Sequence, residues 1–455
     1  MKKEYAAFLA RKEISALANG IDPKPMPGAM KSHQKDATAF AVKRGRSGLF
    51  LDTGLGKTLC QLEWCRQVSH RALILTPLAV AKQIEREATR FGYDARVIKE
   101  QSEASDGINI CNYDRLSKLN PDAFDAISLD ESAILKSFTG KTSRALRETF
   151  SKHRFRLAAS ATPAPNDYME IGTHVDFLSI MSNVEMLSRF FVNDTSTASQ
   201  QWRLKGHAER SFWDWMASWA CMAESPADFG YDDTEYRLPP YKIIKHRIDG
   251  TMPIIRDGLF ASEISATNIH KIKQATTDSR ADRIAELVCA DKDSWIVWCD
   301  LNAEADALTA RIPDAIEVRG SDTIEKKEEN LDAFSSGQAR VIVTKPDIAG
   351  HGLNWQHCAR MAFVGRSFSY ETWYQAVRRS WRYGQKRELQ IHLAVAKGED
   401  QIGRVIDRKG ADHMRMKAQM VAAMRRALGK DVATKIPYRP THKGKIPSWL
   451  KTSAA

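Results

Sequence analysis

The sequence predicts an α/β protein with two lobes, each built on a mostly parallel sheet flanked by helices. Short apolar runs alternate with helical patterns between residues 47 and 160, and the same alternation returns between residues 281 and 395. The pair Pro239-Pro240 lies between the two series and predicts the junction of the lobes. The order strand, helix, strand is typical of a parallel sheet covered on both faces. The chain has 455 residues, 43% of them hydrophobic, which is enough to build several cores and excludes disorder as the main state.

The first series predicts five strands and a helix that follows Lys57. In the helix, Leu59, Leu62, Cys65 and Val68 recur at three-residue spacing on roughly one face. The expected strands are Gly48–Leu51, Ala72–Leu75, Ile108–Cys111, Ala126–Leu129 and Phe155–Ala159.

The second series predicts five more strands, with helices such as Ala281–Ala290 and Ala303–Ala310 before and between them. The expected strands are Trp295–Cys299, Ile316–Val318, Val341–Thr344, Met361–Val364 and Ile391–Val395.

Residues 166–236 break the alternation and predict a helical insertion. The insertion is rich in aromatic residues, which we expect to form its own small core rather than a platform for stacking bases: Trp202, Trp213, Trp215, Trp219, Phe190, Phe191 and Phe212. The chain then divides into an N-terminal helical segment (1–27), a first lobe (28–165), the insertion (166–236), a second lobe (237–400) and a basic C-terminal helix and tail (401–455).

Composition excludes several classes of protein. The seven cysteines are scattered and never spaced as C-x-x-C, so a disulfide framework or a structural zinc site is not expected. No run approaches the roughly 18 apolar residues of a membrane span, and the first apolar stretch ends at Arg11, too early for a secretory signal. We therefore expect a protein without a membrane association that stays in the cytoplasm.

Positive charge is concentrated at the C-terminal end. The formal net charge is +12, and residues 404–455 hold 13 Lys and Arg against three Asp and no Glu. Such a segment favours a polyanion, most simply nucleic acid, although a solubilising tail is an alternative. We expect a helix that packs back on the lobes, carrying the methionines from Met414 to Met424, and then a basic end from Lys435 to Lys451.

The strongest local motif is DTGLGKT, from Asp52 to Thr58, between a predicted strand and a predicted helix. Glycines let backbone N–H groups close around phosphates, and the following helix presents its positive N-terminal end. Lys57 would reach the β- and γ-phosphates of a nucleoside triphosphate, and the Thr58 hydroxyl would ligate Mg²⁺. Leu51 stands where the general phosphate-loop pattern has glycine, which favours the variant loop of motor ATPases over a small GTPase or a nucleotide kinase.

Two further motifs complete a hydrolytic site. Asp130 and Glu131 follow an apolar strand, so that Asp130 can hold Mg²⁺ and Glu131 can deprotonate an attacking water. Arg379 and Arg382, three residues apart in the segment Gln375–Gln385, lie on one face of a helical turn and can stabilise the charge of a γ-phosphate from the second lobe. For Arg378 we expect contact with nucleic-acid phosphates instead.

In this order the motifs resemble those of superfamily-two helicases and translocases, most closely the compact bacterial or bacteriophage Swi/Snf-type DNA-dependent ATPases. The resemblance spans about residues 30–390. It rests on His33-Gln34, DTGLGKT, Leu75–Leu78, Cys111–Leu116, the DES box with residues 134–146, Ser160–Pro163, Ala349–Asn354 and Gln375–Gln385.

The resemblance implies two RecA-like lobes, ATP and Mg²⁺ as cofactors, and double-stranded or forked DNA as the partner of a monomer. Catalysis is then assigned to Lys57, Glu131, Arg379 and Arg382, nucleotide binding to Gln34, Thr53, Gly54, Leu55, Gly56, Lys57, Thr58 and Gly352, and Mg²⁺ to Thr58 and Asp130. By the same resemblance, Ser160 and Thr162 would couple hydrolysis to lobe movement. The expected nucleic-acid contacts are Thr76, Asn112, Tyr113, Lys136, Thr344 and Asn354.

The sequence departs from the Swi/Snf pattern at two places. Ala133 stands where the acidic box usually has histidine, and Ser160-Ala161-Thr162-Pro163 replaces a Gly-Thr-Pro motif. These differences leave an RNA helicase open as an alternative. A DNA-stimulated switch that recruits partners without moving is also open, as is a replication or nuclease partner. A strand-separating helicase needs a wedge, for which Asp249-Gly250 and Asp257-Gly258 are weak turn candidates.

Overall fold

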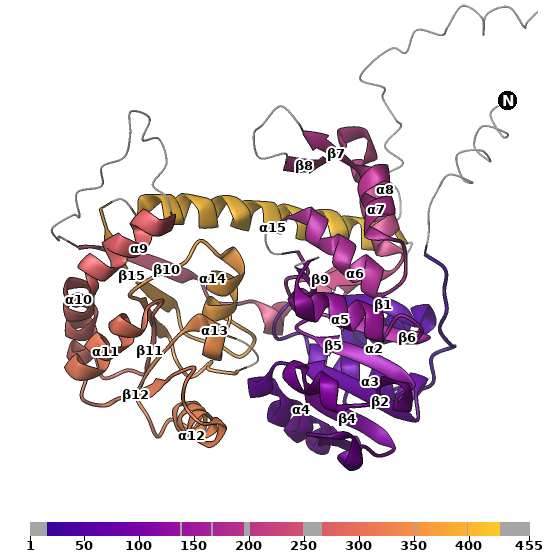
Figure 1. Ribbon diagram of the computed structural model, residues 1–455, viewed down its shortest axis with the longest axis horizontal. Helices are drawn as coiled ribbons and strands as arrows, with labels where there is room; N and C mark the ends of the chain where they lie inside the picture. Colours follow the sequence, from indigo (N-terminus) through magenta and orange to yellow (C-terminus); the bar gives the residue numbers. More distant parts are fainter. Residues whose placement is uncertain are drawn as a thin grey trace, which may run out of the picture.

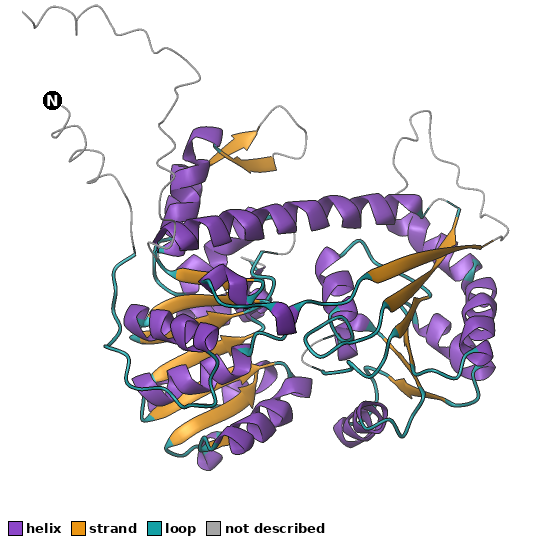
Figure 2. Ribbon diagram, turned by 180° about the vertical axis from the view of Figure 1, so that it is seen from behind, coloured by secondary structure: helices purple, strands orange, loops and turns teal. Residues whose placement is uncertain are grey.

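The computed structural model describes residues 16–136, 139–164, 167–194, 201–248, 266–350, 353–397 and 399–427. Two RecA-like α/β lobes lie side by side, and one long helix, α15 (Asp400–Ala427), runs over both of them (Figures 1 and 2). In each lobe the described strands form one parallel sheet that carries helices on its faces. The expected fold class is therefore confirmed.

The first lobe contains a sheet of seven strands, all paired in parallel. In sheet order the strands are β3 (Ala95–Val97), β4 (Gly107–Asn112), β2 (Arg71–Thr76), β5 (Ala126–Asp130), β6 (Phe155–Ala159), β1 (Arg46–Leu51) and β9 (Ala220–Ala223). The flanking helices are α2 (Ser32–Arg44), α3 (Lys57–Val68), α4 (Leu78–Phe91) and α5 (Lys141–Thr149). Most residues of the central strands are buried, which explains their continuous apolar sequence.

The second lobe contains a sheet of six strands, again paired in parallel. In sheet order they are β10 (Tyr241–Ile248), β15 (Leu389–Ala396), β14 (Arg360–Phe363), β11 (Trp295–Trp298), β13 (Val341–Thr344) and β12 (Ala315–Val318). The helices are α9 (Ala266–Ala275), α10 (Thr277–Ala290), α11 (Asn302–Arg311), α12 (Ile324–Ser335), α13 (Pro346–Ala349) and α14 (Tyr370–Val377). Side chains alternate between two cores, since Val297 joins one and its neighbour Ile296 joins the other.

The segment expected to be a helical insertion is only partly helical. It contains α6 (Ile171–Phe177), α7 (Asn183–Phe190), the antiparallel pair β7 (Phe191–Asp194) and β8 (Gln201–Leu204), α8 (Glu209–Ala217) and the strand β9. Strand β9 belongs to the first lobe, where it pairs with β1. The expected insertion, residues 166–236, therefore includes one strand that belongs to the sheet of the first lobe.

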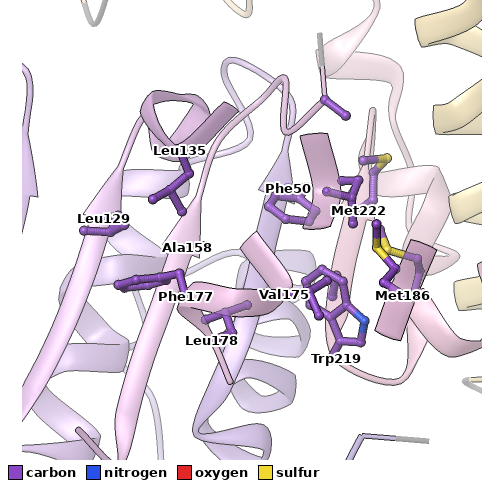
Figure 3. Packing of buried hydrophobic residues seen from close by; sticks show 14 of the residues in the cluster. Phe50, Leu129, Leu135, Ala158, Val175, Phe177, Leu178, Met186, Trp219 and Met222 are labelled. Atoms are coloured by element: carbon purple, nitrogen blue, oxygen red, sulfur yellow. The ribbon is translucent and has the colours of Figure 1, made fainter. Parts of the chain in front are cut away.

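The aromatic residues of this segment do not form a separate core, contrary to the prediction. Trp215, Trp219 and Phe212 belong to the same buried cluster as Phe50 of β1 and Leu129 of β5. Figure 3 shows Phe50 beside Trp219 and Met222, with Val175 and Met186 close by. The reason is that β9 extends the sheet of the first lobe, so that the helices beside β9 pack on a face of that sheet.

Helix α15 packs on both lobes. Near its beginning, Ile402 and Ile406 contact Ile269 and Tyr370 of the second lobe. Further along, Met416 and Met420 enter the core of the first lobe. The expected packing of this helix on the lobes is thus observed, and the expected basic end from Lys435 to Lys451 lies outside the described residues.

The N-terminal segment differs from the expectation. Residues 1–15 lie outside the described part, and residues 16–27 contain no helix. Among the described residues, no helix has the length and apolarity needed to cross a bilayer. In the same residues all seven cysteines are free, and no cluster of side chains has the composition of a metal centre with three or more His, Cys, Asp or Glu ligands.

Candidate nucleotide site between the lobes

A glycine-containing turn joins β1 to α3 and leaves the beginning of α3 open. Gly54 and Gly56 have positive φ angles of 94° and 82°, a conformation that residues with a Cβ atom rarely adopt. Gly56 caps α3 without a side-chain hydrogen bond. The first N–H groups of α3 therefore point into the turn, where an anion can accept them.

The turn is supported by the helix that precedes β1. The Gln34 amide nitrogen donates a hydrogen bond of 3.1 Å to the Leu55 carbonyl, and its oxygen accepts one of 2.9 Å from the backbone of Lys31. The ring of His33 lies 3.3 Å from the same Leu55 oxygen. A methyl group on Gly56 would lie 2.1 Å from the Gln34 amide nitrogen, so a larger residue there would displace Gln34. Gln34 thus holds the turn in this structure, and its expected contact with a nucleotide stays a prediction.

Lys57, Asp130 and Glu131 meet at the carboxyl ends of β1 and β5. The Lys57 ammonium lies 3.9 Å from a Glu131 oxygen. Asp130 is buried and accepts hydrogen bonds from Gln61 at 2.9 Å and from the Thr76 hydroxyl at 3.0 Å. Burial, followed by the charge of Glu131, raises the pKa of the Asp130 carboxyl.

These side chains suit a magnesium nucleotide. Thr58 is the second residue of α3, and its hydroxyl together with the Asp130 carboxylate offers the hard oxygen donors that Mg²⁺ prefers. Glu131 has a positive φ of 50°, which is uncommon for a residue with a side chain and is often seen at functional sites. The donor set therefore fits the expected Mg²⁺, which Thr58 and Asp130 would hold.

The second lobe contributes arginines from the end of α14. Arg379 is 2% exposed and donates to the carbonyls of Gln375 at 3.0 Å and Leu353 at 3.1 Å. Arg382 donates to the same Leu353 carbonyl at 3.1 Å. Burial lowers the pKa of Arg379 to about 10, and the charge of Glu131 opposes that shift. The pKa of Arg382 falls to about 9, through burial and then the neighbouring Arg379. Arg379 is buried and Arg382 is half-buried, and the charge of Glu131 acts on the pKa of both.

Arg378 does not face solvent, contrary to its expected contact with nucleic acid. It is 5% exposed, and its guanidinium lies 2.9 Å from Asp52 and 3.1 Å from the Thr53 carbonyl. Its Nε also donates to the Thr53 hydroxyl. A Cβ atom on Gly54 would lie 2.7 Å from the Cβ of Tyr383, so this second-lobe residue packs directly on the turn. The sequence contained no local signal for this contact because its partners are separated by more than 300 residues.

A histidine does contact the acidic box, but it comes from the segment after the first lobe. The Ser132 hydroxyl lies 3.1 Å from Nε2 of His174 in α6. His174 is fully buried, and burial lowers its pKa to about 4, so the ring is neutral near pH 7. In the predicted coupling motif, the Ser160 hydroxyl accepts the Thr162 N–H at 3.1 Å. His174 was missed because nothing in the local pattern links it to a box 42 residues earlier.

The residues expected to contact nucleic acid divide into two groups. Thr76, Tyr113 and Thr344 are buried and donate their hydroxyls to Asp130, the Asp130 carbonyl and the Val318 carbonyl, respectively. These hydroxyls are therefore engaged within the protein in this structure, a direction that residue type does not reveal, and their predicted contact with nucleic acid stays a prediction.

Of the other three expected contacts, Lys136 and Asn354 are exposed, whereas Asn112 is as buried as Tyr113. Asn112 accepts the Arg115 N–H at 3.1 Å. Lys136 reaches across to Glu371 of the second lobe. Of the predicted nucleotide contacts, Gly352 lies outside the described residues.

Comparisons with known protein families find a model that matches part of the second lobe. Residues 279–384 match the family model described as the helicase conserved C-terminal domain, a range that includes Arg378, Arg379 and Arg382. This part of the second lobe is therefore similar to helicase C-terminal domains. A solved structure described as the Sulfolobus solfataricus SWI2/SNF2 ATPase core in complex with dsDNA is similar at 16% identity and a TM-score of 0.41, covering 91% of this chain and 99% of that chain. A search of curated proteins finds no match.

Proposed function

We propose that this protein is a superfamily-two ATPase that hydrolyses ATP to move along DNA with little sequence specificity. One observation carries the proposal: Glu131 of the first lobe lies 3.9 Å from Lys57, and its charge acts to raise the pKa values of Arg379 and Arg382 of a helicase-type second lobe. A phosphate group placed among these side chains would be contacted by both lobes. A metabolic kinase would leave the arginines of the second lobe without a role.

ATP would bind with its phosphates at the beginning of α3. The open N–H groups of this helix and the Lys57 ammonium favour negative charge there. Mg²⁺, held by Thr58 and Asp130, would neutralise phosphate charge. The Glu131 carboxylate would accept the proton of a water whose oxygen attacks the γ-phosphorus, and ADP would leave.

Hydrolysis would drive motion because the arginines gain an anionic partner only when the lobes hold the nucleotide together. A ligand shifts a conformational equilibrium only through such a difference in contacts. Arg379 and Arg382 both donate to the Leu353 carbonyl, so contact with a phosphate would also move the loop that contains Leu353. We propose that this loop transmits the nucleotide state to bound DNA.

DNA is favoured as the polymer by charge and by the motif resemblance. Residues 404–455 hold 13 Lys and Arg, which suit phosphate contacts that carry no sequence information.

The test measures ATP hydrolysis with no polymer, single-stranded DNA, double-stranded DNA, forked DNA and RNA in parallel. We expect the strongest stimulation by double-stranded or forked DNA. Glu131→Gln should lower kcat by about 100-fold or more while ATP still binds, because the base is lost and the shape of the side chain is kept. Glu148→Gln is the matched control, since Glu148 forms an exposed ion pair with Arg144 on α5. Normal hydrolysis by Glu131→Gln, or stimulation by RNA alone, would contradict the proposal.

A clamp that hydrolyses ATP without moving would give the same hydrolysis results. Displacement of a third strand from triplex DNA separates the two functions, because only a translocating protein removes the strand in an ATP-dependent way. Hydrolysis without displacement would favour the switch over the motor.

A further inference from the structure

A buried group of charged side chains joins the nucleotide turn to both the second lobe and α15. Asp52, the residue after β1, lies 2.9 Å from Arg378 and 3.1 Å from Lys417 of α15. The Tyr374 hydroxyl donates to the same carboxylate at 2.7 Å and lies 3.2 Å from the Lys417 nitrogen. Lys417 also pairs with Glu224, which follows β9, at 3.2 Å.

This charged group is buried, so each of its contacts compensates a charge that water does not reach. Lys417 is only 3% exposed, and Asp52 only 7%. Burial alone would raise the pKa of the Asp52 carboxyl. The charges of Arg378 and Lys417 together outweigh burial and hold this pKa well below its usual range. Burial lowers the pKa of Lys417, but Asp52, Tyr374 and Glu224 together raise it above its usual range, so the ammonium stays charged. Removal of either partner would leave a buried charge with less compensation, which is strongly unfavourable.

The geometry links Lys417 to the shape of the nucleotide turn. One oxygen of Asp52 accepts the Thr53 N–H at 2.6 Å, as well as the Tyr374 hydroxyl and Arg378. The other oxygen faces Lys417. Lys417 therefore fixes the rotation of the carboxylate, and the carboxylate fixes the first peptide group of the turn that leads to Lys57.

We propose that Lys417 is a positioning residue of the nucleotide site and that α15 is a working part of the ATPase rather than an appended tail. Lys417 lies outside every sequence motif described above and acts through Asp52. The inference rests on the proposed function, because it assumes that the turn binds a nucleotide.

The test uses the full chain and the substitution Lys417→Met, which keeps the length of the side chain and removes its charge. We expect the Kd for fluorescent N-methylanthraniloyl-ADP and the KM for ATP to rise about tenfold, while kcat at saturating ATP changes less than about threefold. Lys417→Arg should recover most of the affinity. Asp52→Asn should weaken binding similarly, and the double variant should bind no worse than the weaker single variant, because both substitutions break one pair.

Arg415→Met is the matched control on the same helix. Arg415 forms an exposed ion pair of 3.0 Å with Glu209 of α8, so its loss should leave nucleotide affinity unchanged. Wild-type affinity in Lys417→Met, even with a lower melting temperature, would overturn the inference, as would additive effects in the double variant. If Lys417→Met fails to fold, wild-type affinity in Asp52→Asn overturns it. If the wild-type chain binds no nucleotide, the proposed function fails as well.

Discussion

The two lobes contain similar strand–turn–helix units, but they differ in whether a carboxylate of the protein accepts the N–H groups of the turn. In the first lobe, the turn from β1 to α3 contains two glycines with positive φ, and no side chain caps the helix. In the second lobe, the turn from β11 to α11 is closed by Glu304, whose carboxylate accepts the N–H groups of Asp300 at 2.8 Å and Leu301 at 3.0 Å.

This difference explains how two similar sheets can have unequal roles. The first lobe offers the open N–H groups at the beginning of α3 to an external anion, whereas in the second lobe a carboxylate of its own accepts the two N–H groups just before α11. Gly365 makes room for that carboxylate, since a Cβ atom there would lie 2.5 Å from both Glu304 oxygens. The second lobe therefore contributes to the proposed site through arginines on another turn, not through a second nucleotide pocket.

The largest effect is expected from Gly54→Ala, which breaks the open turn of the first lobe. The new Cβ would meet the Cβ of Tyr383, which the second-lobe backbone holds in place, and the φ of 94° adds strain. We expect kcat/KM for ATP to fall by about 100-fold or more, equivalent to about 2.7 kcal/mol. Gly92→Ala is the control, because Gly92 also has a positive φ, 76°, but has no neighbouring atom within 4 Å of the added carbon. Equal losses in both variants would mean that backbone strain alone is responsible.

A smaller effect is expected from Glu304→Ala, which opens the turn of the second lobe. Two partly buried N–H groups lose their acceptor, so the free energy of unfolding should fall by about 2 kcal/mol in urea titrations. The variant should gain no second site for N-methylanthraniloyl-ADP, because its turn lacks the glycines and the lysine. Glu286→Ala removes an exposed pair with Arg283 and should change stability by less than about 0.5 kcal/mol. A new nucleotide site would contradict the comparison.

His174→Phe tests whether the rate of ATP hydrolysis depends on the contact between His174 of α6 and Ser132. Phenylalanine keeps the ring that packs edge-on against Phe50 but loses the contact with Ser132. We expect kcat to fall about tenfold with little change in KM, since Ser132 directly follows the proposed base Glu131. His207→Phe, at an exposed position of the same segment, should have the wild-type rate. A raised KM with a normal kcat would place His174 in binding instead.

The smallest effect concerns the pH dependence of the second lobe. Burial, followed by the neighbouring His246, lowers the pKa of His392 to about 4; Arg360 and Arg283 add to the shift and Asp291 opposes it. The unfolded chain therefore binds the proton more readily, and stability is lost as pH falls from about 6.5 toward 4. Between pH 7 and pH 5 we expect a loss on the order of 1 kcal/mol, measured by urea unfolding, that is reduced in His392→Gln. An unchanged acid response in this variant would assign the loss to other groups.

Much of the fold could be predicted because buried parallel strands are continuous apolar runs. All ten strands expected in the two lobes are present, with ends that differ by no more than two residues. Three strands of the two sheets were missed: β3 and β9 have only three and four residues, and β10 mixes basic and apolar residues at the edge of its sheet. Their assignment depends on tertiary pairing, which local sequence does not encode.

The candidate site could be predicted only where its chemistry is local. The glycines near Lys57 and the pair Asp130-Glu131 are contiguous motifs, and the structure brings Lys57 and Glu131 together. The contacts from Asp52 to Lys417 and from Ser132 to His174 join distant parts of the chain. Burial of such polar residues depends on partners that only the fold supplies.

Helix α15 also limits how far the lobes can separate. Its 28 residues form a rod of about 42 Å, anchored by apolar side chains at both ends. The arginines of the second lobe are consequently kept at a high effective concentration near the turn that would hold the phosphates. Each return to the closed arrangement would then be an intramolecular rotation with a small entropic cost. A chain cut before α15 would have only the interlobe linker to bring the arginines back to the turn.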